Sequence, residues 1–581
     1  MTKLSSFKNF SEFEFDFIDI ETHEDDSFYF LYVYGDNFDE AINSWYEFFD
    51  LVVSDSYIKK KNRYLFYGHY AGAFDYLYML DWIAENNVID LASIRIIDSS
   101  GLIIRIVFEY QGVTFDFRDS YALSRMSLNS WASKLLNEQK IDIDIEHRDS
   151  IDRNKFIEYC RRDCQLGYKC VKKYAEIFDN NVKITISSQA VDLFRRHFLK
   201  TEWPQLSHFW YKQMRHFYYG GRVEVFKRYG ENVISYDINQ AYGFIMKEFG
   251  APVGLPRLGD KFEEDKVGFY VIRLKKIPEF FIPSLGAKLN FMGQKSFMFC
   301  NSKEIDYYVT NFDLLNLIEK NVDFKILISY IYDYDKMFFQ SFVDYCYSQI
   351  SYDDNTKPIW KLVVNSLYGK LGQNRTMKQI KIAPDSAYYY DENFKIGYSD
   401  VYYQTDFSNP QISAWITSGC RYLLNSYLQK YQDNLYYCDT DSLFLDIEPS
   451  DDISNIEMGK LKIEKVCKKL YVVGNKFYGY IDENDNFQTV IKGFPARIKG
   501  KEVGIFSEDQ FKAAIFENKF DFKYTTDWKV SKFKSAIRES NRFLNIKRNT
   551  TKEIKRSIVK RKIKKDGINT RPFYYINSQF I

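Results

Sequence analysis

Glycine and proline are scarce in this sequence, and it has no cysteine pairs or long apolar runs. Only 27 glycines and 11 prolines occur in 581 residues, which excludes collagenous and Gly/Pro-rich low-complexity chains. The 8 cysteines include no CxxC pair, so neither a zinc ribbon nor a disulfide scaffold is indicated. No apolar run approaches 18 residues and the first residues hold no apolar segment. We therefore expect no secretion signal, no membrane span and a location in the reducing cytoplasm.

Charge is balanced overall but unevenly distributed along the chain. Lys and Arg number 80 against 79 Asp and Glu, so the net charge of +1 indicates no class of partner. Residues 9–58 nevertheless hold fourteen acidic side chains and no Lys or Arg, whereas residues 529–565 hold fifteen Lys and Arg against two acids. The basic segment is either a solvated surface or one that contacts phosphates. Aromatic rings available there for stacking are Phe533, Phe543, Tyr574 and Tyr575.

One predicted strand, residues 13–21, ends in two carboxylates. Its odd-numbered side chains are apolar as far as Phe17 and are followed by Asp19 and Glu21. Alternation with a period of two predicts a strand with one buried face. Because unpaired buried carboxylates are costly, this pair either requires a cation or lies where the strand reaches the surface.

Two further segments place carboxylates at strand ends. In residues 435–445 the odd-numbered face brackets Asp439 and Asp441 between apolar side chains. This pattern favours a tight hairpin or a metal site. Residues 233–238 form a short β-type run that reaches Asp237 and then gives way to a helical pattern. A strand–Asp–helix corner would place this carboxylate and the start of the helix beside one pocket.

Carboxylates at these positions suit Mg²⁺, which takes oxygen ligands and is usually held by one or two carboxylates plus phosphates. Two ions about 3.5–4 Å apart would activate a 3′-hydroxyl and stabilise a leaving pyrophosphate. The residues with the right ligand type for such a centre are Asp237, Asp439 and Asp441. Asp19 with Glu21 would suit a separate hydrolytic centre.

Residues 357–369 predict a helix with one polar stripe. At about 100° per residue, four polar side chains form that stripe: Lys357, Lys361, Asn365 and Tyr368. Apolar side chains fill the remaining arc. The two ammonium groups could hold a triphosphate, whereas the alternative is an ordinary amphipathic helix with its lysines in water. Pro358 lacks a backbone N–H, so it either starts the helix or kinks it.

Together these segments resemble the motifs of family B DNA polymerases. Residues 237–242 resemble motif A, residues 361–369 motif B, residues 437–442 motif C, and residues 476–478 the later Lys-x-Tyr motif. Motif A departs from the family at Gln240, Ala241 and Gly243 but keeps its aspartate and tyrosine.

The resemblance implies roles for single residues. Asp237 and Asp441 would hold two Mg²⁺ ions, for which Mn²⁺ can substitute, with Asp439 and the backbone of Ile238 assisting. Tyr242 would exclude a ribose 2′-hydroxyl. The residues implied in binding the incoming nucleotide are Tyr242, Lys357, Lys361, Asn365 and Tyr368. Lys476 and Tyr478 would hold the primer end.

The amino-terminal part resembles the proofreading 3′–5′ exonuclease of the same family. Residues 19–21, 69–75 and 159–163 match its three motifs, and Lys140 resembles its assisting lysine. The residues implied in binding two further Mg²⁺ ions are Asp19, Glu21, Asp75 and Asp163. Tyr159 and Lys140 would assist catalysis, and His69 and Phe74 would contact DNA. Tyr70 stands where the family has an asparagine, and Cys160 and Cys164 are interpreted as packing residues.

Two motifs favour the protein-primed branch of the family. Residues 218–221, Tyr-Tyr-Gly-Gly, resemble its linker motif, and residues 417–421 resemble its Thr…Arg motif, with Cys420 in place of a smaller residue. Contacts with DNA or primer are thereby implied for Tyr218, Gly220, Gly221, Thr417 and Arg421. Two long intervals between the polymerase motifs leave room for the insertions of this branch.

The fold implied is an α/β and α+β multidomain one, with a ribonuclease H-like 3′–5′ exonuclease domain followed by a right-hand polymerase domain. The expected domains are the exonuclease 1–180, first palm part 181–260, first terminal-protein insertion 261–345, fingers 346–372, second insertion 373–412, second palm part 413–495 and thumb 496–581.

The function implied is DNA-dependent DNA synthesis that starts on a hydroxyl of a separate terminal protein and proceeds with strand displacement and proofreading. One alternative is a family B enzyme with an ordinary nucleic-acid primer, and another is a non-catalytic DNA-binding protein. The expected partners are template and primer DNA, deoxynucleoside triphosphates and the terminal protein, with the chain itself monomeric. The resemblance is to replicases of small tailed phages and linear plasmids, which implies the cytoplasm of a host cell.

Overall fold

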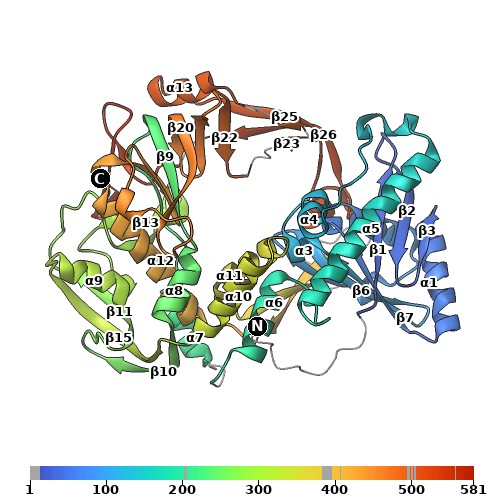
Figure 1. Cartoon of the computed structure of the whole chain (residues 1–581), viewed down its shortest axis with the longest axis horizontal. Helices are drawn as coiled ribbons and strands as arrows, with labels where there is room; N and C mark the ends of the chain where they lie inside the picture. Colours follow the sequence, from blue (N-terminus) through green and yellow to red (C-terminus); the bar gives the residue numbers. More distant parts are fainter. Residues whose placement is uncertain are drawn as a thin grey trace.

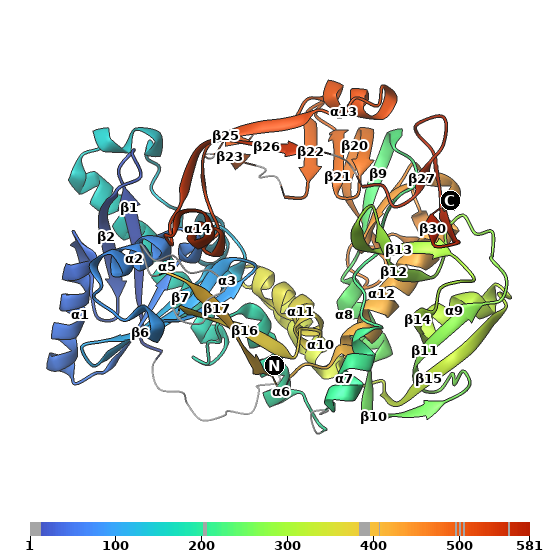
Figure 2. The same ribbon diagram turned by 180° about the vertical axis from the view of Figure 1, so that it is seen from behind.

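The computed structural model describes residues 13–201, 206–382, 396–405, 407–493, 497–498, 501–502, 506–555 and 558–580. The boundary expected between residues 495 and 496 lies outside these ranges, as do residues 383–395 of the second expected insertion. Two large sheets lie on opposite sides of the molecule, with helices between them and a long hairpin reaching from one side to the other (Figures 1 and 2).

The first sheet has the strand order β17-β16-β5-β6-β7-β4-β1-β2-β3. Its strands are β1 (Asp16–Thr22), β2 (Phe28–Gly35), β3 (Asp39–Ile42), β4 (Arg63–Gly68), β5 (Arg95–Ser99), β6 (Leu102–Tyr110), β7 (Val113–Asp119), β16 (Thr376–Ile382) and β17 (Tyr398–Gln404). Strand β16 pairs with β5 antiparallel, Ile380 facing Ile96. Residues of the second expected insertion therefore extend a sheet that is otherwise built from the first 120 residues.

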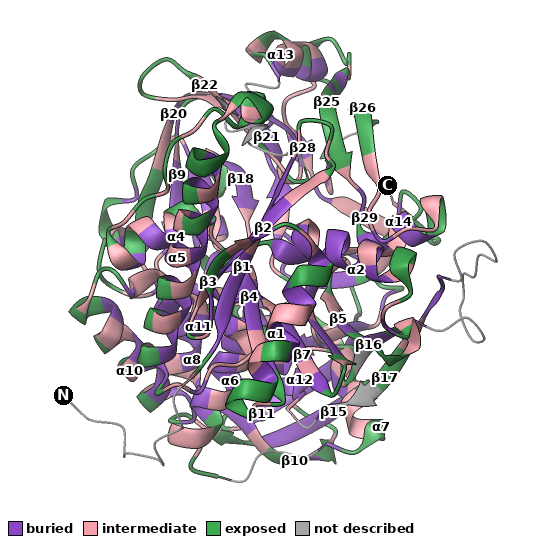
Figure 3. Ribbon diagram, turned by 90° about the vertical axis from the view of Figure 1, so that its right-hand side faces the viewer, coloured by how far each residue is buried: buried purple, intermediate pink, exposed green. Residues whose placement is uncertain are grey.

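Helices cover both faces of this sheet, so β1 is buried on both sides. They are α1 (Trp45–Lys59), α2 (Asp75–Asn86), α4 (Leu128–Leu136) and α5 (Arg153–Ile177). Phe17 packs into the core on the α5 side, whereas Ile18 and Ile20 pack into the core that contains α1 and α2. The expectation of a single buried face is wrong, since most of β1 has the buried colour in Figure 3. Even Asp16 is fully buried, and hydrogen bonds that it accepts from Asn37 and Phe38 offset the cost.

The second sheet has the strand order β22-β21-β20-β9-β19-β18-β8. Its strands are β8 (Val223–Val225), β9 (Tyr229–Ile238), β18 (Leu435–Asp439), β19 (Ser442–Leu445), β20 (Leu461–Gly474), β21 (Phe477–Ile481) and β22 (Phe487–Ile491). The expected strand that reaches Asp237 is confirmed as the end of β9, and helix α8 (Ala241–Phe249) follows it. Residues 435–445 form the tight hairpin, since Asp439 pairs with Ser442 and Thr440 adopts a left-handed φ of 64°.

Between the two sheets lie helices α6 (Ile186–His197), α10 (Gln340–Tyr352) and α11 (Lys357–Leu371) (Figure 1). Helix α11 confirms the helix expected from residue 357, and Pro358 starts it without kinking it because it occupies the first turn. Val363, Val364 and Leu367 are buried, whereas Lys361 and Asn365 are exposed. The predicted separation into a packing arc and a polar stripe is therefore present.

Smaller sheets and α12 (Pro410–Lys430) complete this side of the molecule. One sheet has the order β10-β15-β11-β14 and another β12-β13-β29-β30. Their strands are β10 (Ala251–Gly259), β11 (Val267–Leu274), β12 (Gly286–Phe291), β13 (Gln294–Asn301), β14 (Tyr307–Thr310), β15 (Phe324–Asp335), β29 (Phe573–Ile576) and β30 (Gln579–Phe580). Because β13 pairs with β29, the C-terminal residues are anchored on the segment that follows α8.

A hairpin of β25 (Phe522–Val530) and β26 (Ile546–Ile554) reaches back to the first sheet, and its tip carries α14 (Phe533–Ser540) (Figure 2). We call residues 531–545 the clasp. Phe533 and Phe543 of the clasp are buried in the core of the first sheet, so the expectation that they are free for stacking is wrong. Tyr574 and Tyr575 are half-buried.

Ion pairs join the basic C-terminal segment to the acidic N-terminal part. Arg542 binds Asp81 and Glu85, and the Asp81 carboxylate also accepts the backbone N–H of Phe543 at 2.8 Å. Arg548 binds Asp26. Part of the basic segment is thus used in internal contacts, an outcome that neither interpretation of the sequence anticipated.

All 8 cysteines are free and buried. Among the described residues, we find no helix with the length and apolar character that crossing a bilayer requires.

Two candidate carboxylate centres

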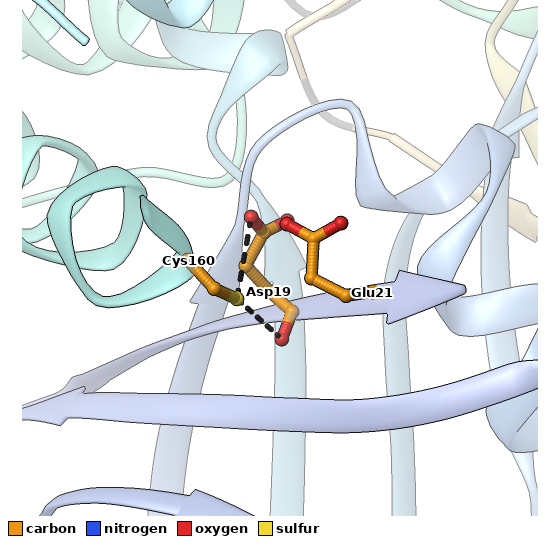
Figure 4. A group of neighbouring side chains, drawn as sticks. All are labelled: Asp19, Glu21 and Cys160. Atoms are coloured by element: carbon orange, nitrogen blue, oxygen red, sulfur yellow. Dashed lines mark hydrogen bonds between the residues drawn. The ribbon is translucent and has the colours of Figure 1, made fainter. Parts of the chain in front are cut away.

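The first centre lies where β1, α2 and α5 meet. Asp19 and Glu21 project to the same side of β1, and Cys160 of α5 lies beside Asp19 (Figure 4). Asp75, the first residue of α2, accepts the backbone N–H of Ile20 at 3.0 Å. Asp163 reaches the same point from α5, as its electrostatic effect on Asp19 and Glu21 indicates. Four carboxylates that are far apart in the sequence are therefore gathered in one buried place.

Burial and mutual repulsion raise the pKa values of these carboxyl groups. Burial, with the nearby Asp163, raises the pKa of Glu21 to about 8, and burial raises that of Asp75 to about 6. The pKa of Asp19 is raised well above its usual range by burial and by Asp75. Carboxylates crowded in this way need a cation in order to ionise.

Asp163 supports the fit of a metal here. Among the described residues, its buried Oδ1 has no hydrogen-bond partner, whereas Lys140 forms an ion pair with its Oδ2. A buried oxygen without a partner is costly unless a ligand satisfies it. Tyr159 lies one helical turn before Asp163, and Lys140 Nζ is 5.1 Å from the centroid of its ring. The two assisting residues expected from the sequence are thus beside the carboxylates.

Cys160 lies beside this centre as well. Its Sγ is 3.7 Å from the carbonyl oxygen of Asp19 and 3.9 Å from Asp19 Oδ2 (Figure 4). Burial raises the pKa of the Cys160 thiol well above its usual range, so it stays protonated. Because Mg²⁺ takes oxygen ligands, the interpretation of Cys160 as a packing residue is favoured. Cys164 is also buried and bonds to the carbonyl of Tyr32.

His69 faces inward in the structure. Its Nδ1 lies 2.9 Å from Ser120 Oγ and its Nε2 2.9 Å from the carbonyl oxygen of Met126, while burial lowers its pKa to about 4. A neutral histidine with both ring nitrogens engaged positions the loop that follows β4.

A cavity of about 600 Å³ opens beside Glu21, and aromatic rings line it. Phe74 and Tyr70 contribute from the loop before α2, and Trp528 contributes from β25. The Phe74 and Trp528 ring centroids are 6.2 Å apart. Sequence reasoning missed Trp528 because no motif surrounds it and its partner is more than 450 residues away.

The second centre lies on the second sheet, where β9 and β19 run side by side. Asp237 faces Ser442 across the two strands, and the backbone N–H of Ile238 donates to the carbonyl of Asp441 at 2.7 Å. Burial and the adjacent Asp441 raise the pKa of Asp237 to about 7, and burial and Asp439 raise that of Asp441 to about 6. The residues predicted from separate motifs therefore converge, and their crowding fits a divalent cation.

Asp439 is paired with Lys476. The Lys476 ammonium lies 2.5 and 2.7 Å from the two carboxylate oxygens, so a residue expected at the primer end neutralises a residue expected to assist metal binding. Tyr478 is only 6% exposed and lies within the sheet beside Lys465.

The polar stripe of α11 faces this centre. The rings of Tyr242 and Tyr368 are stacked, with centroids 4.2 Å apart and planes 13° apart. Burial and neighbouring lysines lower the pKa of Lys361, whereas Asp237 raises it. The influence of Asp237 indicates that the Lys361 ammonium lies near the carboxylates. Lys357, at the start of the stripe, pairs with Asp354 at 3.1 Å.

The linker motif (residues 218–221) and the Thr…Arg motif (residues 417–421) contact each other next to the hairpin of residues 435–445. Arg421 is 5% exposed and donates from Nη1 to the carbonyls of Tyr219 and Gly220, both at 3.2 Å. Thr417 is also buried. A side chain added at Gly221 would lie 2.7 Å from Thr440 Cγ2, whereas Gly220 has open space around it. Tyr218 packs against Gly372 at the end of α11.

Glu464 and Lys462 are two charged neighbours of Asp237 that sequence reasoning missed. Lys462 pairs with Asp237 across β20 and β9, and Glu464 lies in a bulge of β20, where Ser235 Oγ donates to it at 3.0 Å. Both contribute to the electrostatic environment of Asp237. Alternation along residues 461–474 could have predicted the strand. No local pattern reveals the bulge at Glu464, which places its carboxylate against Ser235.

Comparison with protein families identifies the chain. Residues 133–457, more than half of its length, match the family described as DNA polymerase type B, organellar and viral. The chain belongs to this family. The matched residues include Asp163, Asp237 and Asp441, whereas Asp19, Glu21 and Asp75 precede them.

Relatives of the type B polymerase occur in phages and fungi. The chain is 25% identical over 486 residues to the DNA polymerase of Streptococcus phage Cp-1, which covers 77% of this chain and 82% of that protein. It is 27% identical over 367 residues to a probable DNA polymerase of Neurospora intermedia, which covers 56% of this chain but 38% of that protein. The chain thus spans little more than a third of that fungal relative. The resemblance to protein-primed family B polymerases of phages and plasmids is confirmed.

The fold matches a known polymerase structure as well. Phi29 DNA polymerase, in a complex with primer-template DNA and incoming nucleotides, superimposes with a TM-score of 0.75 at 19% identity, over 93% of this chain and 100% of the other. The expected mixed α/β multidomain fold is confirmed at this level.

Proposed function

We propose that this chain is a DNA-directed DNA polymerase with a separate 3′–5′ exonuclease centre, and that it starts synthesis on a terminal protein. The observation that carries the proposal is the convergence of Asp237 and Asp441 beside the exposed Lys361 of α11. Carboxylates that crowd beside a cationic helix face match the needs of phosphoryl transfer, in which metals and lysines neutralise a triphosphate.

In the proposed polymerase centre, Asp237 and Asp441 would hold two Mg²⁺ ions, with Mn²⁺ as a substitute and with Asp439 and the Ile238 backbone assisting. When bound, the metal supplies Lewis-acid activation of the primer 3′-hydroxyl. Lys361 and Asn365, together with Lys357, would bind the incoming deoxynucleoside triphosphate. The stacked Tyr242 and Tyr368 would form the wall beside its sugar and base.

In the proposed exonuclease centre, Asp19, Glu21, Asp75 and Asp163 would hold the metal ions. The crowding of these four groups and the unsatisfied Oδ1 of Asp163 support this assignment. The cavity beside Glu21 has room for a terminal nucleotide, with Phe74 against its base. Lys140 and Tyr159 would orient Asp163.

The finer domain organisation belongs to the same proposal. The first sheet with α5 would be the ribonuclease H-like exonuclease domain, and the second sheet with α11 the palm and fingers of the right hand. The β25–β26 hairpin would be the thumb. The proposed boundaries are those expected from the sequence, with terminal-protein insertions at 261–345 and 373–412.

Priming on a protein hydroxyl is supported by the linker and Thr…Arg motifs, whose residues contact each other through Arg421 and Gly220. The first insertion would contact the terminal protein and the second would surround DNA during strand displacement. A labelling reaction with template, one labelled nucleotide and a candidate terminal protein tests this step. A protein–nucleotide adduct supports it, whereas extension of DNA primers without any adduct favours the alternative of an ordinary nucleic-acid primer.

Primer extension with Mg²⁺ tests the polymerase activity itself. Asp441→Asn should abolish extension and leave 3′–5′ degradation of single-stranded DNA intact, and Asp19→Asn should do the reverse. Loss of both activities in either variant contradicts two separate centres. A wild-type chain that binds DNA without extending a primer would favour the non-catalytic alternative.

A further inference from the structure

Three charged side chains are buried together beside the hairpin of residues 435–445, and the proposed function uses none of them: Arg222, Glu224 and Arg561. Each of the three is at most 1% exposed. Arg222 donates to Oε2 of Glu224 from Nε, at 2.7 Å, and also from Nη2. On the other side of this carboxylate, Arg561 Nη1 lies 3.8 Å from Oε1. Glu224 is thus held between two guanidinium groups that lie far apart in the sequence.

This cluster is attached directly to the hairpin. Glu224 lies in β8, which pairs with β18 so that Glu224 faces Cys438. The backbone N–H of Thr440 donates to the carbonyl oxygen of Arg222 at 2.7 Å. Thr440 has a left-handed φ of 64°, and the residues on either side of it are the two carboxylates of the turn. A shift of Arg222 would therefore move the turn that carries both carboxylates.

The Arg222 side chain joins β8 to other elements on this side of the molecule. Its Nη1 donates to the carbonyl oxygen of Pro283 at 2.8 Å and to Oδ1 of Asn425, in α12, at 3.0 Å. The guanidinium carbon lies 4.0 Å from the centroid of the Phe299 ring, in β13. Contacts with α12 and β13, in addition to the ion pair with Glu224, therefore hold the Arg222 carbonyl in place.

Arg561 reaches Glu224 from the C-terminal segment. Its Nη2 donates to the carbonyl oxygen of Phe281 at 2.9 Å and its Nε to Thr570 Oγ1 at 3.0 Å, while its guanidinium carbon lies 4.6 Å from the ring centroid of Phe226. Among the described residues, Glu224 Oε1 and Arg561 Nη1 have no hydrogen-bond partner, so their mutual attraction offsets their burial. Burial lowers the pKa of Arg561 to about 10 and Glu224 raises it. The guanidinium therefore stays charged at neutral pH.

A buried ion cluster is weak evidence for stability, because apolar side chains of similar volume often stabilise a core as well. Such a cluster does specify geometry, since each buried charge is compensated only where its partners lie. We propose that Glu224 is a positioning residue of the polymerase centre. Held between Arg222 and Arg561, it fixes β8, and β8 fixes the turn that carries the two carboxylates. This inference rests on the proposed polymerase function, but the order of the hairpin can be measured independently of that function.

The test combines single-turnover primer extension with amide exchange of residues 435–445. Glu224→Gln keeps the size of the side chain but removes its charge, and Arg561→Met removes one of its two partners. Both variants should lower the maximal extension rate by about 10-fold or more, because small displacements of reacting groups have large effects on rate. The nucleotide concentration that gives half the maximal rate should stay close to the wild-type value, because the polar stripe of α11 is untouched. Exchange of the hairpin amides should be faster, and Arg561→Lys, which keeps a cation facing Glu224, should restore most of the rate.

Asp116 provides a matched control, because it is a fully buried carboxylate of β7 in the first sheet and binds three arginines: Arg63, Arg105 and Arg118. Asp116→Asn should lower the unfolding temperature, as Glu224→Gln does, but leave the extension rate and the exchange of the hairpin amides unchanged.

The proposal is overturned if folded Glu224→Gln and Arg561→Met extend primers and exchange their hairpin amides as the wild type does. It is also overturned if Asp116→Asn loses as much extension as they do, because the effect is then one of stability alone. If Glu224→Gln does not fold, Arg561→Met and its lysine counterpart decide. A wild-type chain that extends no primer contradicts the polymerase function, whereas exchange of the hairpin amides in the variants still tests the positioning.

Discussion

At the scale of residues, both centres consist of carboxyl groups. The pKa values of these groups indicate how each centre responds to pH and to a cation. Asp237, Asp441, Glu21 and Asp75 all have pKa values raised above their usual range, in each case chiefly by burial. A carboxyl group whose pKa is raised on folding favours the folded state at low pH, and this contribution is lost as pH rises through the raised value. Without metal, the unfolding free energy should therefore fall between about pH 5 and pH 8.

Metal binding should release protons near neutral pH. Burial and Asp163 raise the pKa of Glu21 to about 8, so this group is largely protonated at pH 7 and must lose its proton when a cation binds. Calorimetric titration with Mn²⁺ in two buffers of different ionisation enthalpy should show release of at least about one proton. Glu21→Gln should reduce that number, whereas Asp482→Asn, at an exposed turn, should not. Binding without proton release contradicts a metal site at Glu21.

At the scale of elements, sequence patterns predicted the helices and strands whose formation depends on residues close together in the chain. The β-type run before Asp237 and the helix from Lys357 form as expected, because each depends on neighbouring residues. The tight hairpin around Thr440 is one of the two outcomes that the sequence favoured there. The burial of Arg421 behind the hairpin was not foreseeable. It depends on the carbonyls of Tyr219 and Gly220, about 200 residues earlier, whose orientation no periodicity encodes.

Gly221 and Gly220 offer a matched test of the hairpin geometry. In Gly221→Ala the new Cβ would meet Thr440 at 2.7 Å, so the turn that carries Asp439 and Asp441 has to shift. We expect destabilisation of about 1–3 kcal/mol and a loss of primer extension of about 100-fold. Gly220→Ala has open space around its Cβ and should change the unfolding free energy by less than about 0.5 kcal/mol. Chemical denaturation of both variants checks this, and equal stability contradicts it.

At the scale of the whole molecule, contacts between the ends of the chain decide the architecture. The clasp inserts Phe533 and Phe543 into the core of the first sheet, and β16 adds to the edge of the same sheet at β5. The uneven distribution of charge along the sequence did not predict that its acidic and basic parts would meet. It could not specify that Arg542 would find Asp81, since the pairing depends on where β25 and β26 direct the chain.

Asp81 should hold the clasp closed. Its carboxylate is 7% exposed, binds Arg542 and accepts the backbone N–H of Phe543. Asp81→Ala removes a buried partner from both groups, which should cost about 3 kcal/mol. Amide exchange of residues 531–545 should then be about 100-fold faster, and raised salt should have a smaller further effect than in the wild type. Asp142→Ala, an exposed substitution, is the control, and unchanged exchange in Asp81→Ala contradicts the role of this contact.

The central claim is that two separate groups of carboxylates gather divalent cations. Anomalous diffraction from crystals grown with Mn²⁺, primer-template DNA and an incoming nucleotide tests it most directly. We predict anomalous density between Asp237 and Asp441, and independent density among Asp19, Glu21, Asp75 and Asp163. Density at neither group, or at Asp441 without any contribution from Asp237, would contradict the account.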